Sequence, residues 1–236
     1  MSDDGIDDED ANAHTGASFT DLMASLMVIF VLLFVATVSN ASASRTAVQN
    51  MLLESLRAKL TAKGVDTATI HRDERDPYAI VIVMPSSLLF NRDASDVRPD
   101  GQKYLQDVVP VLSGILCDAD MIRNIDNVVV EGHTDTTYFG TVRELTPDQG
   151  QAYNLKLSQA RSMEVVKSAL QALRDLPYRG CFRSMLSASG RGQEEPLPDV
   201  PGDDERQRRV VFKIRVKADL VAQLTARVPS GEAPPR

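Results

Sequence analysis

The longest run of apolar positions in the chain lies near its N-terminus. Residues 18–40 contain one ionisable side chain, that of Asp21, among uncharged and mostly apolar residues. A helix of about twenty such residues spans roughly 30 Å of hydrocarbon, the thickness of a bilayer core. The pattern therefore predicts one transmembrane helix over residues 18–40, and no later apolar run is long enough to predict another.

A cleaved export signal is the alternative interpretation of this segment. The residues "NASAS" at 40–44 offer a cleavage site between small side chains. Export signals begin with basic residues and have a shorter apolar core, whereas acids precede this segment. We therefore expect an uncleaved membrane anchor.

A second apolar stripe follows the predicted membrane helix. Val48, Leu52, Leu56 and Leu60 recur every four residues within 45–63, the spacing of one helix face, and Gly64 marks the helix end. Two interpretations remain open: the stripe pairs with a second copy of the chain, or it packs on the chain's own domain. Residues 41–76 are accordingly expected to form a linker that contains an amphipathic helix.

Strands and helices alternate in the remainder of the chain. Runs of β-branched residues predict strands, and apolar positions at helical spacing predict helices, one of which is expected to kink or break at Pro110. The expected strands cover 78–85, 127–135, 183–190 and 208–217, and the expected helices cover 99–117 and 152–173. This alternation predicts an α/β sandwich, a mixed sheet with helices on one face, over residues 77–219.

Negative charge is concentrated at the N-terminus. The chain has a net charge of −7, and its first 20 residues contain no Lys or Arg but six acids: Asp3, Asp4, Asp7, Asp8, Glu9 and Asp10. We expect residues 1–17 to be a disordered acidic tail and residues 220–236 to be a disordered C-terminal tail. The chain shows no basic patch and has no Trp, which argues against nucleic-acid binding.

Membrane orientation and redox compartment are not decided by charge or cysteine content. The first basic residues, Arg45, Arg57 and Lys59, follow the membrane segment and so give no support for a cytoplasmic N-terminus. Cys117 and Cys181 are compatible with one disulfide in an oxidising compartment and, about equally, with two buried thiols.

Polar motifs follow one another in the predicted domain. They are "EGHTD" at 131–135, "NLKLSQAR" at 154–161, "GRGQEEP" at 190–196 and "RQRRVVFKI" at 206–214. Together they resemble the OmpA-like peptidoglycan-binding domain over residues 79–217. That family binds the free end of diaminopimelate in the wall peptide, where an ammonium group and a carboxylate lie side by side. The resemblance therefore implies a site in which an acid and an arginine complement this zwitterion.

By position in the motifs, the acid is Asp135 and the arginine is Arg161. The resemblance also implies secondary candidates around this pair: Asn91, Asp93, Thr134, Asn154 and Ser158. The alternative is a plain salt bridge between Asp135 and Arg161 that binds no ligand. Two departures from the family pattern concern the ligand, because a long insertion follows Asp135 and Gln207 replaces an Asn of the last motif.

Catalysis and metal binding have no support in the sequence. The three histidines, His14, His71 and His133, show no metal-ligand spacing, so we interpret His133 as structural and expect no metal or cofactor. The chain shows no nucleophile with a base at recognisable spacing and no phosphate-binding glycine loop. We therefore do not expect an enzyme.

The whole arrangement resembles a second family. An acidic head, one helix beginning "FTDLM", a helical linker and an OmpA-like domain resemble the B subunits of ion-driven stator units such as MotB, and most closely the ZorB family of Zorya anti-phage defence systems. This resemblance implies that Asp21 carries the transported ion, with H⁺ favoured over Na⁺, and that Ser25 is either a helper or a helix-packing residue.

The same resemblance implies partners and a location. It implies a homodimer surrounded by a pentameric ring of multi-span ZorA-like or MotA-like subunits. It also implies an inner-membrane protein with a cytoplasmic N-terminus and a periplasmic domain bound to peptidoglycan. Two rivals remain, a flagellar stator subunit and a passive wall tether in which Asp21 carries no ion.

Overall fold

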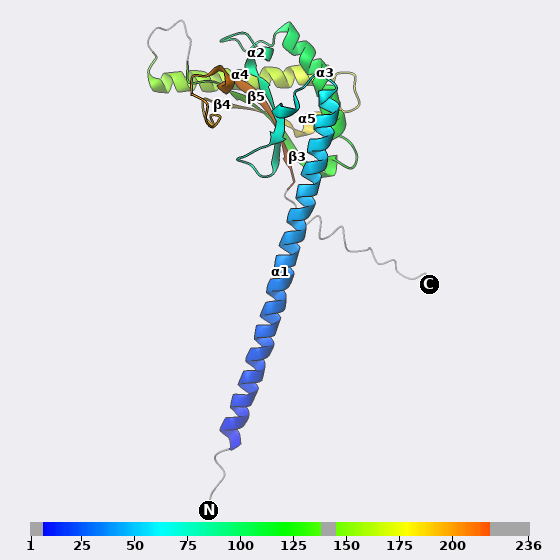
Figure 1. The fold of residues 1–236 in the computed structure, drawn as a ribbon, viewed down its shortest axis with the longest axis vertical. Helices are drawn as coiled ribbons and strands as arrows, with labels where there is room; N and C mark the ends of the chain where they lie inside the picture. The colour runs from blue at the N-terminus through cyan, green and yellow to red at the C-terminus, as the bar shows by residue number, and fades with distance from the viewer. Residues whose placement is uncertain (1–6, 138–144, 218–236) are drawn as a thin grey trace, which may run out of the picture. The chain divides into compact units, whose positions relative to one another are not determined.

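The computed structural model describes residues 7–137 and 145–217, with the side chains of residues 21–39, 46–137 and 145–217. The chain divides into two units between Thr46 and Ala47. Most of helix α1 (Asp7–Thr61) lies in the first unit, and every other described element lies in the second, Ala47–Ala218 (Figure 1). The expected C-terminal tail at 220–236 lies outside the described residues.

Helix α1 contains the apolar segment. Among the described residues, Asp21–Ser39 is the one stretch long and apolar enough to cross a membrane, by length and composition. The helix already begins at Asp7, so the expectation of disorder is wrong for residues 7–17, whereas residues 1–6 lie outside the described residues. Acids in a first helical turn interact favourably with the partial positive charge of the helix N-terminus, which accounts for this early start.

The last turns of α1 belong to the folded unit. Leu52, Leu56 and Leu60 are fully buried in the same core as the sheet, and the chain turns at Gly64, whose φ is +82°. The structure therefore shows the second of the two interpretations, a stripe packed on its own domain and not on another chain. The folded unit consequently begins at Ala47, within the segment expected to be a linker.

Five strands form one mixed sheet in the order β1-β2-β5-β3-β4. Neighbouring strands are antiparallel except for β3 and β4, which are parallel and are connected by the crossover helix α4. In this register Phe212 lies opposite Ile82 on one side and Val130 on the other. The strands are β1 (Ile70–Arg72), β2 (Ala79–Pro85), β3 (Ile125–His133), β4 (Leu186–Gly192) and β5 (Arg209–Val216).

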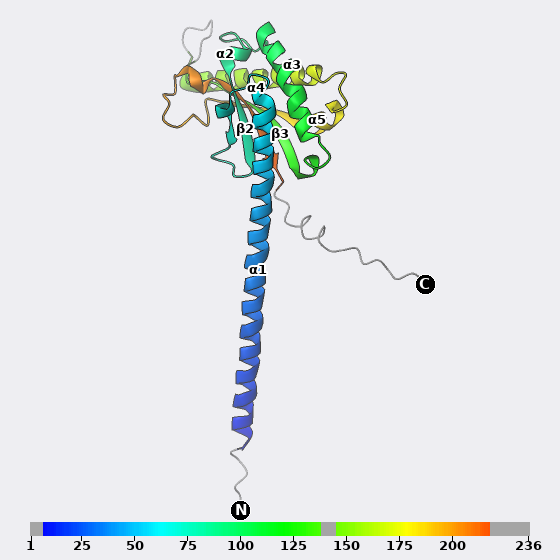
Figure 2. The same cartoon turned by 45° about the vertical axis from the view of Figure 1, so that its right-hand side comes forward.

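The helices cover one face of this sheet. Alternate strand residues such as Ile80, Val128 and Ile214 are fully buried against Leu105 of α3 and Val165 of α4. Helices α3 and α5 lie side by side in both views (Figures 1 and 2). The α-helices of this domain are α2 (Ser86–Leu89), α3 (Pro99–Leu116), α4 (Pro147–Ala172) and α5 (Arg179–Met185), with short 3₁₀ turns at Thr67–Thr69, Ile122–Asn124 and Glu205–Gln207.

Three helix boundaries differ from the sequence-based expectation. Helix α3 continues through Pro110 and does not break there, because its flanking residues Val109 and Leu112 are fully buried and packing compensates for the missing backbone donor. Helix α4 begins earlier than expected, since Thr146 and Gln149 form a reciprocal capping box. Residues 183–185, the start of an expected strand, belong to helix α5 (Arg179–Met185).

Cys117 and Cys181 form a disulfide that joins the end of α3 to α5. The double variant Cys117→Ser/Cys181→Ser is expected to lose about 4 kcal/mol of unfolding free energy, because the bridge closes a loop across a sequence separation of 64 residues. Urea unfolding of the oxidised protein and the double variant would measure this loss. Equal stabilities would contradict a structural role for the bridge.

Candidate functional site

Asp135 and Arg161 come together because α4 packs directly on the ends of β3 and β4. Asp135 lies two residues beyond His133, the last residue of β3, and Arg161 lies in the middle of α4. A Cβ atom at Gly132 would collide with the main chain of Ser158, and one at Gly190 would collide with the main chain of Gln159. Glycine is therefore required at both strand positions for the helix to approach this closely.

Two predicted secondary residues connect α4 to these strand ends. The Ser158 hydroxyl accepts a hydrogen bond from the Gly192 N–H at 2.8 Å, and Asn154 Nδ2 donates to the Asp135 carbonyl at 3.0 Å. Thr146 caps the helix, so neither Asn154 nor Ser158 does. Asn154 thus holds the backbone of the acid in place, and Ser158 ties α4 to the end of β4.

A small polar pocket contains most of the predicted site residues. Arg161 and Asp135 line it together with the secondary candidates Asp93, Thr134 and Asn154. Asn91 contributes its main-chain carbonyl to Arg161, and Ser158 does not line the pocket. Four further residues line the pocket without a signal in the sequence that pointed to them: Arg92, Thr137, Leu157 and Arg208.

The carboxylate of Asp135 is buried and already has three hydrogen-bond donors. Its Oδ1 accepts from the backbone N–H of Thr137 at 3.1 Å and from the Thr137 hydroxyl at 2.7 Å. Its Oδ2 accepts from Arg208 Nη1 at 2.5 Å. The acid therefore pairs with Arg208, and the plain Asp135–Arg161 salt bridge that was the alternative interpretation is not formed.

Arg161 is a buried cation with an unused donor. It is 3% exposed, and its Nε donates to the Ala94 carbonyl at 2.9 Å. Its guanidinium lies over the ring of Phe90, 5.3 Å from the centroid. Nη1 has no hydrogen-bond partner among the described residues, and burial lowers the pKa of this guanidinium, against the attraction of Asp93. A buried guanidinium with a free N–H matches the requirement of an incoming carboxylate.

The proposed membrane acid lies in the first unit. Asp21 begins the apolar stretch of α1, and Ser25 follows one turn later. The Ser25 hydroxyl donates to the main-chain carbonyls of Asp21 at 2.7 Å and Leu22 at 3.1 Å. In the single chain, Ser25 therefore bonds to the backbone and not to the carboxylate.

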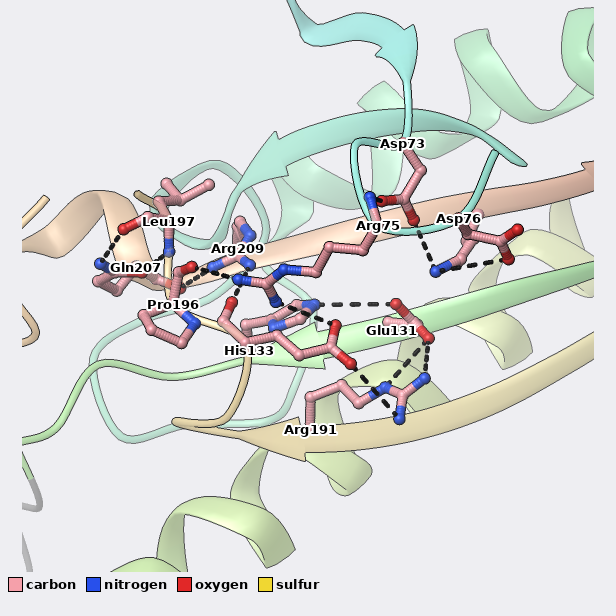
Figure 3. A network of polar contacts seen from close by, with 12 residues as sticks. Asp73, Arg75, Asp76, Glu131, His133, Arg191, Pro196, Leu197, Gln207 and Arg209 are labelled. Carbon is pink, nitrogen blue, oxygen red and sulfur yellow. Dashed lines mark hydrogen bonds and ion pairs between the residues drawn. The ribbon is translucent and has the colours of Figure 1, made fainter. Parts of the chain in front are cut away.

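A second polar cluster lies on the sheet face that points away from the helices. Arg191 Nη2 binds Glu131 Oε1 at 2.6 Å, and Lys213 Nζ binds Asp73 Oδ2 at 2.6 Å (Figure 3). These ion pairs border an open hollow of about 400 Å³, whose apolar lining includes Val81. Alternation along β3 and β5 explains why charged residues gather here, since the intervening residues fill the core.

Three members of this cluster have the ligand atoms for a metal ion. Glu131, His133 and Glu195 each place one such atom within 4.8 Å of the others, a grouping that sequence spacing did not reveal. The guanidinium of Arg191 is already paired with the Glu131 carboxylate, and Arg75 Nη1 lies 3.6 Å from Glu195 Oε2. Because guanidinium groups already neutralise both carboxylates, we interpret the three residues as part of an ion-pair layer.

His133 gives the domain a testable pH dependence. Burial and the nearby charge of Arg209 lower its pKa to about 3, so the folded protein keeps it neutral where the unfolded chain binds a proton. Its contribution to stability is therefore lost as the pH falls from about 6.5 towards 3. Between pH 7 and pH 5, the wild type should lose about 2 kcal/mol more unfolding free energy than His133→Gln, measured with urea. Parallel losses would contradict this assignment.

No protein-family model matches the chain. It is 27% identical over 212 residues to the Zorya protein ZorB of Escherichia coli strain ATCC 8739, a match that covers 86% of this chain and 88% of that protein. The chain is similar to ZorB over most of its length. A second Zorya protein ZorB, from Escherichia coli O139:H28, is 29% identical over 163 residues, which cover 66% of this chain and 60% of that protein.

The fold comparison agrees with the ZorB similarity. A putative MotB-like protein from Desulfovibrio vulgaris has the same fold, with a TM-score of 0.50 and 24% identity over 74% of this chain and 96% of that chain. The predicted ZorB resemblance and the predicted fold are both confirmed, as one apolar N-terminal helix and an α/β domain with helices on one face of a mixed sheet, the fold that the MotB-like protein shares. The apolar helix is long enough to cross a membrane once, as the predicted single-pass topology requires.

Proposed function

We propose that this chain is the peptidoglycan-anchored, ion-conducting B subunit of a proton-driven membrane motor of the Zorya anti-phage type. Similarity to ZorB along 86% of the chain supports a stator subunit of the B type. The single observation that carries the wall-binding part is the buried Nη1 of Arg161, which has no partner among the described residues and lies in the pocket that Asp135 also lines.

The pocket supplies both halves of a zwitterion site. A ligand carboxylate binds the free Nη1 of Arg161, where low exposure strengthens a charge-assisted hydrogen bond. The ligand ammonium binds Asp135, whose Oδ2 has one lone pair left beside the bond from Arg208. The free end of diaminopimelate in the wall peptide has both groups on one carbon atom, which suits an acid and an arginine in one small pocket.

The membrane part of the proposal rests on Asp21. An acid in a membrane helix is costly unless it faces a protein interior or a water path, so partners that enclose it are required. We propose that the partners that enclose Asp21 are a pentameric ring of ZorA-like or MotA-like subunits around a dimer of this chain. Asp21 then binds and releases a proton as it meets each water path, driven by about 2.3 kcal/mol per charge per 100 mV of membrane potential.

The proposed orientation puts the N-terminus in the cytoplasm and the folded domain in the periplasm. The disulfide between Cys117 and Cys181 supports this choice, because disulfides form and persist in oxidising compartments. Peptidoglycan binding would then hold the dimer still while the surrounding ring turns.

Co-sedimentation with purified cell walls tests the wall-binding part. The full chain in detergent micelles is incubated with sacculi whose stem peptides contain diaminopimelate, and with sacculi that contain lysine in its place. Lysine keeps the ammonium but lacks the neighbouring carboxylate, so we expect sedimentation with the first kind and at least about tenfold weaker binding to the second. Equal binding to both, or binding to neither, would refute a site built around Arg161.

A further inference from the structure

The open hollow on the sheet face that points away from the helices has a mixed lining. Its floor is apolar, because Val81 and Val83 of β2 lie beside Val211 of β5, and its rim consists mostly of ionisable side chains. Its volume of about 400 Å³ is that of a small-ligand site. We propose that the hollow binds an uncharged saccharide ring, of which two neighbouring hydroxyl groups donate to Glu131 and Glu195.

The charges around the hollow balance one another. Two lining charges have no ionic partner within 4 Å among the described residues: Glu74 is exposed, and Arg209 is buried and donates to the main-chain carbonyls of Gln207 and Glu195. They have opposite signs, so the lining has no surplus charge for a ligand to neutralise, which favours an uncharged ligand. The other lining charges form the pairs Asp73–Lys213, Glu131–Arg191, Glu195–Arg75 and Arg206–Asp204.

Two carboxylates of the rim keep free acceptor positions although cations compensate their charge (Figure 3). Arg191 bonds only to Oε1 of Glu131, whose Oε2 has His133 Nε2 no nearer than 4.0 Å. The Glu195 carboxylate lies 3.6 Å from Arg75 and 3.8 Å from Arg191, which is too far for hydrogen bonds. One oxygen of each acid lies within 4.8 Å of the other. Two acceptors this close match two adjacent hydroxyl groups.

Hydroxyl groups suit this lining better than other uncharged groups. His133 is 3% exposed, and its Nδ1 has no hydrogen-bond partner among the described residues. A neutral imidazole nitrogen donates or accepts according to its tautomer, and a hydroxyl group matches either case. An alkyl ligand would cover the free acceptors of Glu131 and Glu195 without bonding to them, which is unfavourable.

An extended peptide suits the hollow less well than a ring. Strands β2, β5 and β3 are hydrogen-bonded to one another behind the hollow, so no open strand edge is available there to an added strand. A compact ligand that bonds through side chains needs no such edge.

The loop between β4 and β5 forms one wall of the hollow and is fixed by its own contacts. Glu195 and Asp199 have φ values of 61° and 58°, a left-handed conformation that is unfavourable for residues with side chains. Gln207 holds the segment between and after them, since its Oε1 accepts from the Leu197 N–H at 2.8 Å and its Nε2 donates to the Val200 carbonyl at 3.0 Å. Strained backbone beside a hollow is typical of binding sites, and a fixed wall lowers the entropy lost on binding.

Ligand-observed NMR tests the proposal. The full chain in nanodiscs is mixed with the methyl glycosides of glucose, galactose and mannose, whose adjacent hydroxyl groups differ in orientation. At least one should bind with a dissociation constant of about 1 mM, and its fully O-methylated derivative should bind at least about tenfold more weakly. The proposal would be overturned if no glycoside bound at about 10 mM or if the methylated derivative bound equally well.

Peptide-free wall strands distinguish two sources of such a ring, a soluble saccharide and the glycan of the wall. Internal rings of the wall glycan have an acetamido group and a linked oxygen beside their free hydroxyl, so they lack the adjacent pair. These strands should not displace the bound glycoside. Displacement at an equal concentration of rings would overturn recognition of a hydroxyl pair.

Glu195→Gln should weaken binding of the glycoside about fivefold, because an ionised acceptor forms a stronger hydrogen bond than an amide. Glu194→Gln is the matched control, since this exposed neighbour does not line the hollow, and it should bind like the wild type. Both variants should still sediment with diaminopimelate-containing sacculi, because neither residue lines the pocket of Asp135 and Arg161. Unchanged glycoside binding by Glu195→Gln would contradict the assigned contact.

A second pair of variants fills space in place of removing an acceptor. Val83→Trp puts a large ring on the floor of the hollow and should abolish glycoside binding. Val129→Trp makes the same change on the same face of the sheet but outside the hollow, opposite Lys213, and should leave binding unchanged. Equal binding by Val83→Trp and the wild type would locate the glycoside elsewhere and overturn the proposal, whereas the proposed wall-peptide site would be unaffected.

Discussion

Asp21→Asn is expected to reduce protection against phage to the level of cells without the system. Asparagine keeps the size and polarity of the side chain but cannot exchange a proton, so each partner contact of the helix is retained while ion carriage stops. Expression, membrane insertion and co-purification with the ring subunit should match the wild type. Plating efficiency of phage on cells that produce the complete system measures the effect.

A second aspartate provides the matched control. Asp100→Asn makes the same chemical change at an exposed position in the first turn of α3, and protection should be unaffected. If Asp21→Asn cells were still protected, ion carriage by this residue would be refuted and the passive wall tether would be the better interpretation. If the variant altered swimming and left phage plating unchanged, the chain would be a flagellar stator subunit.

Arg161→Gln is expected to weaken binding to diaminopimelate-containing sacculi by about 100-fold or more. The variant removes a buried charge that, in the proposal, donates to a ligand carboxylate, and each charge-assisted hydrogen bond contributes roughly 1.5–3 kcal/mol. Asp135→Asn should cause a comparable loss, since it removes the partner of the ligand ammonium and leaves Arg208 without its acid. Co-sedimentation over a range of wall concentrations measures both.

Two further variants separate binding from folding. Arg161 also donates to the carbonyls of Ala94 and Asn91, so thermal unfolding must show that the variant domain is intact. Arg161→Lys keeps the charge without the guanidinium fork and should lose an intermediate amount of affinity. Arg191→Gln removes an arginine from the opposite face of the sheet and should bind like the wild type. An intact Arg161→Gln domain that sediments normally would exclude Arg161 from the site.

The strands and the principal site residues were predictable from sequence for a physical reason. Runs such as "YAIVIVMP" combine β-branched residues with a short length, and three of the four expected strands lie within two residues of those observed, at β2, β3 and β5. Asp135 and Arg161 lie in motifs whose order matched a family, so five of the seven predicted binding residues line one pocket.

What the sequence did not reveal depends on contacts between distant segments. The Leu52 stripe shows which face of a helix is apolar but not what covers it, which is why two interpretations stayed open until the packing was known. Arg208 lies 73 residues from Asp135, and no local pattern distinguishes it from Arg209, which faces the opposite side of the sheet. Helix α5 has only seven residues, too few for a periodic pattern.

Main-chain contact between α4 and the strand ends has a consequence for how ligands associate. Since Gly132 and Gly190 put backbone against backbone, main-chain contact fixes how closely α4, which carries Arg161, approaches the strand ends beside Asp135. Such a preorganised receptor loses little conformational entropy on association. We expect peptides of different length to associate at similar rates and to differ mainly in residence time, so a stiff mimic of the peptide terminus would be an effective competitor.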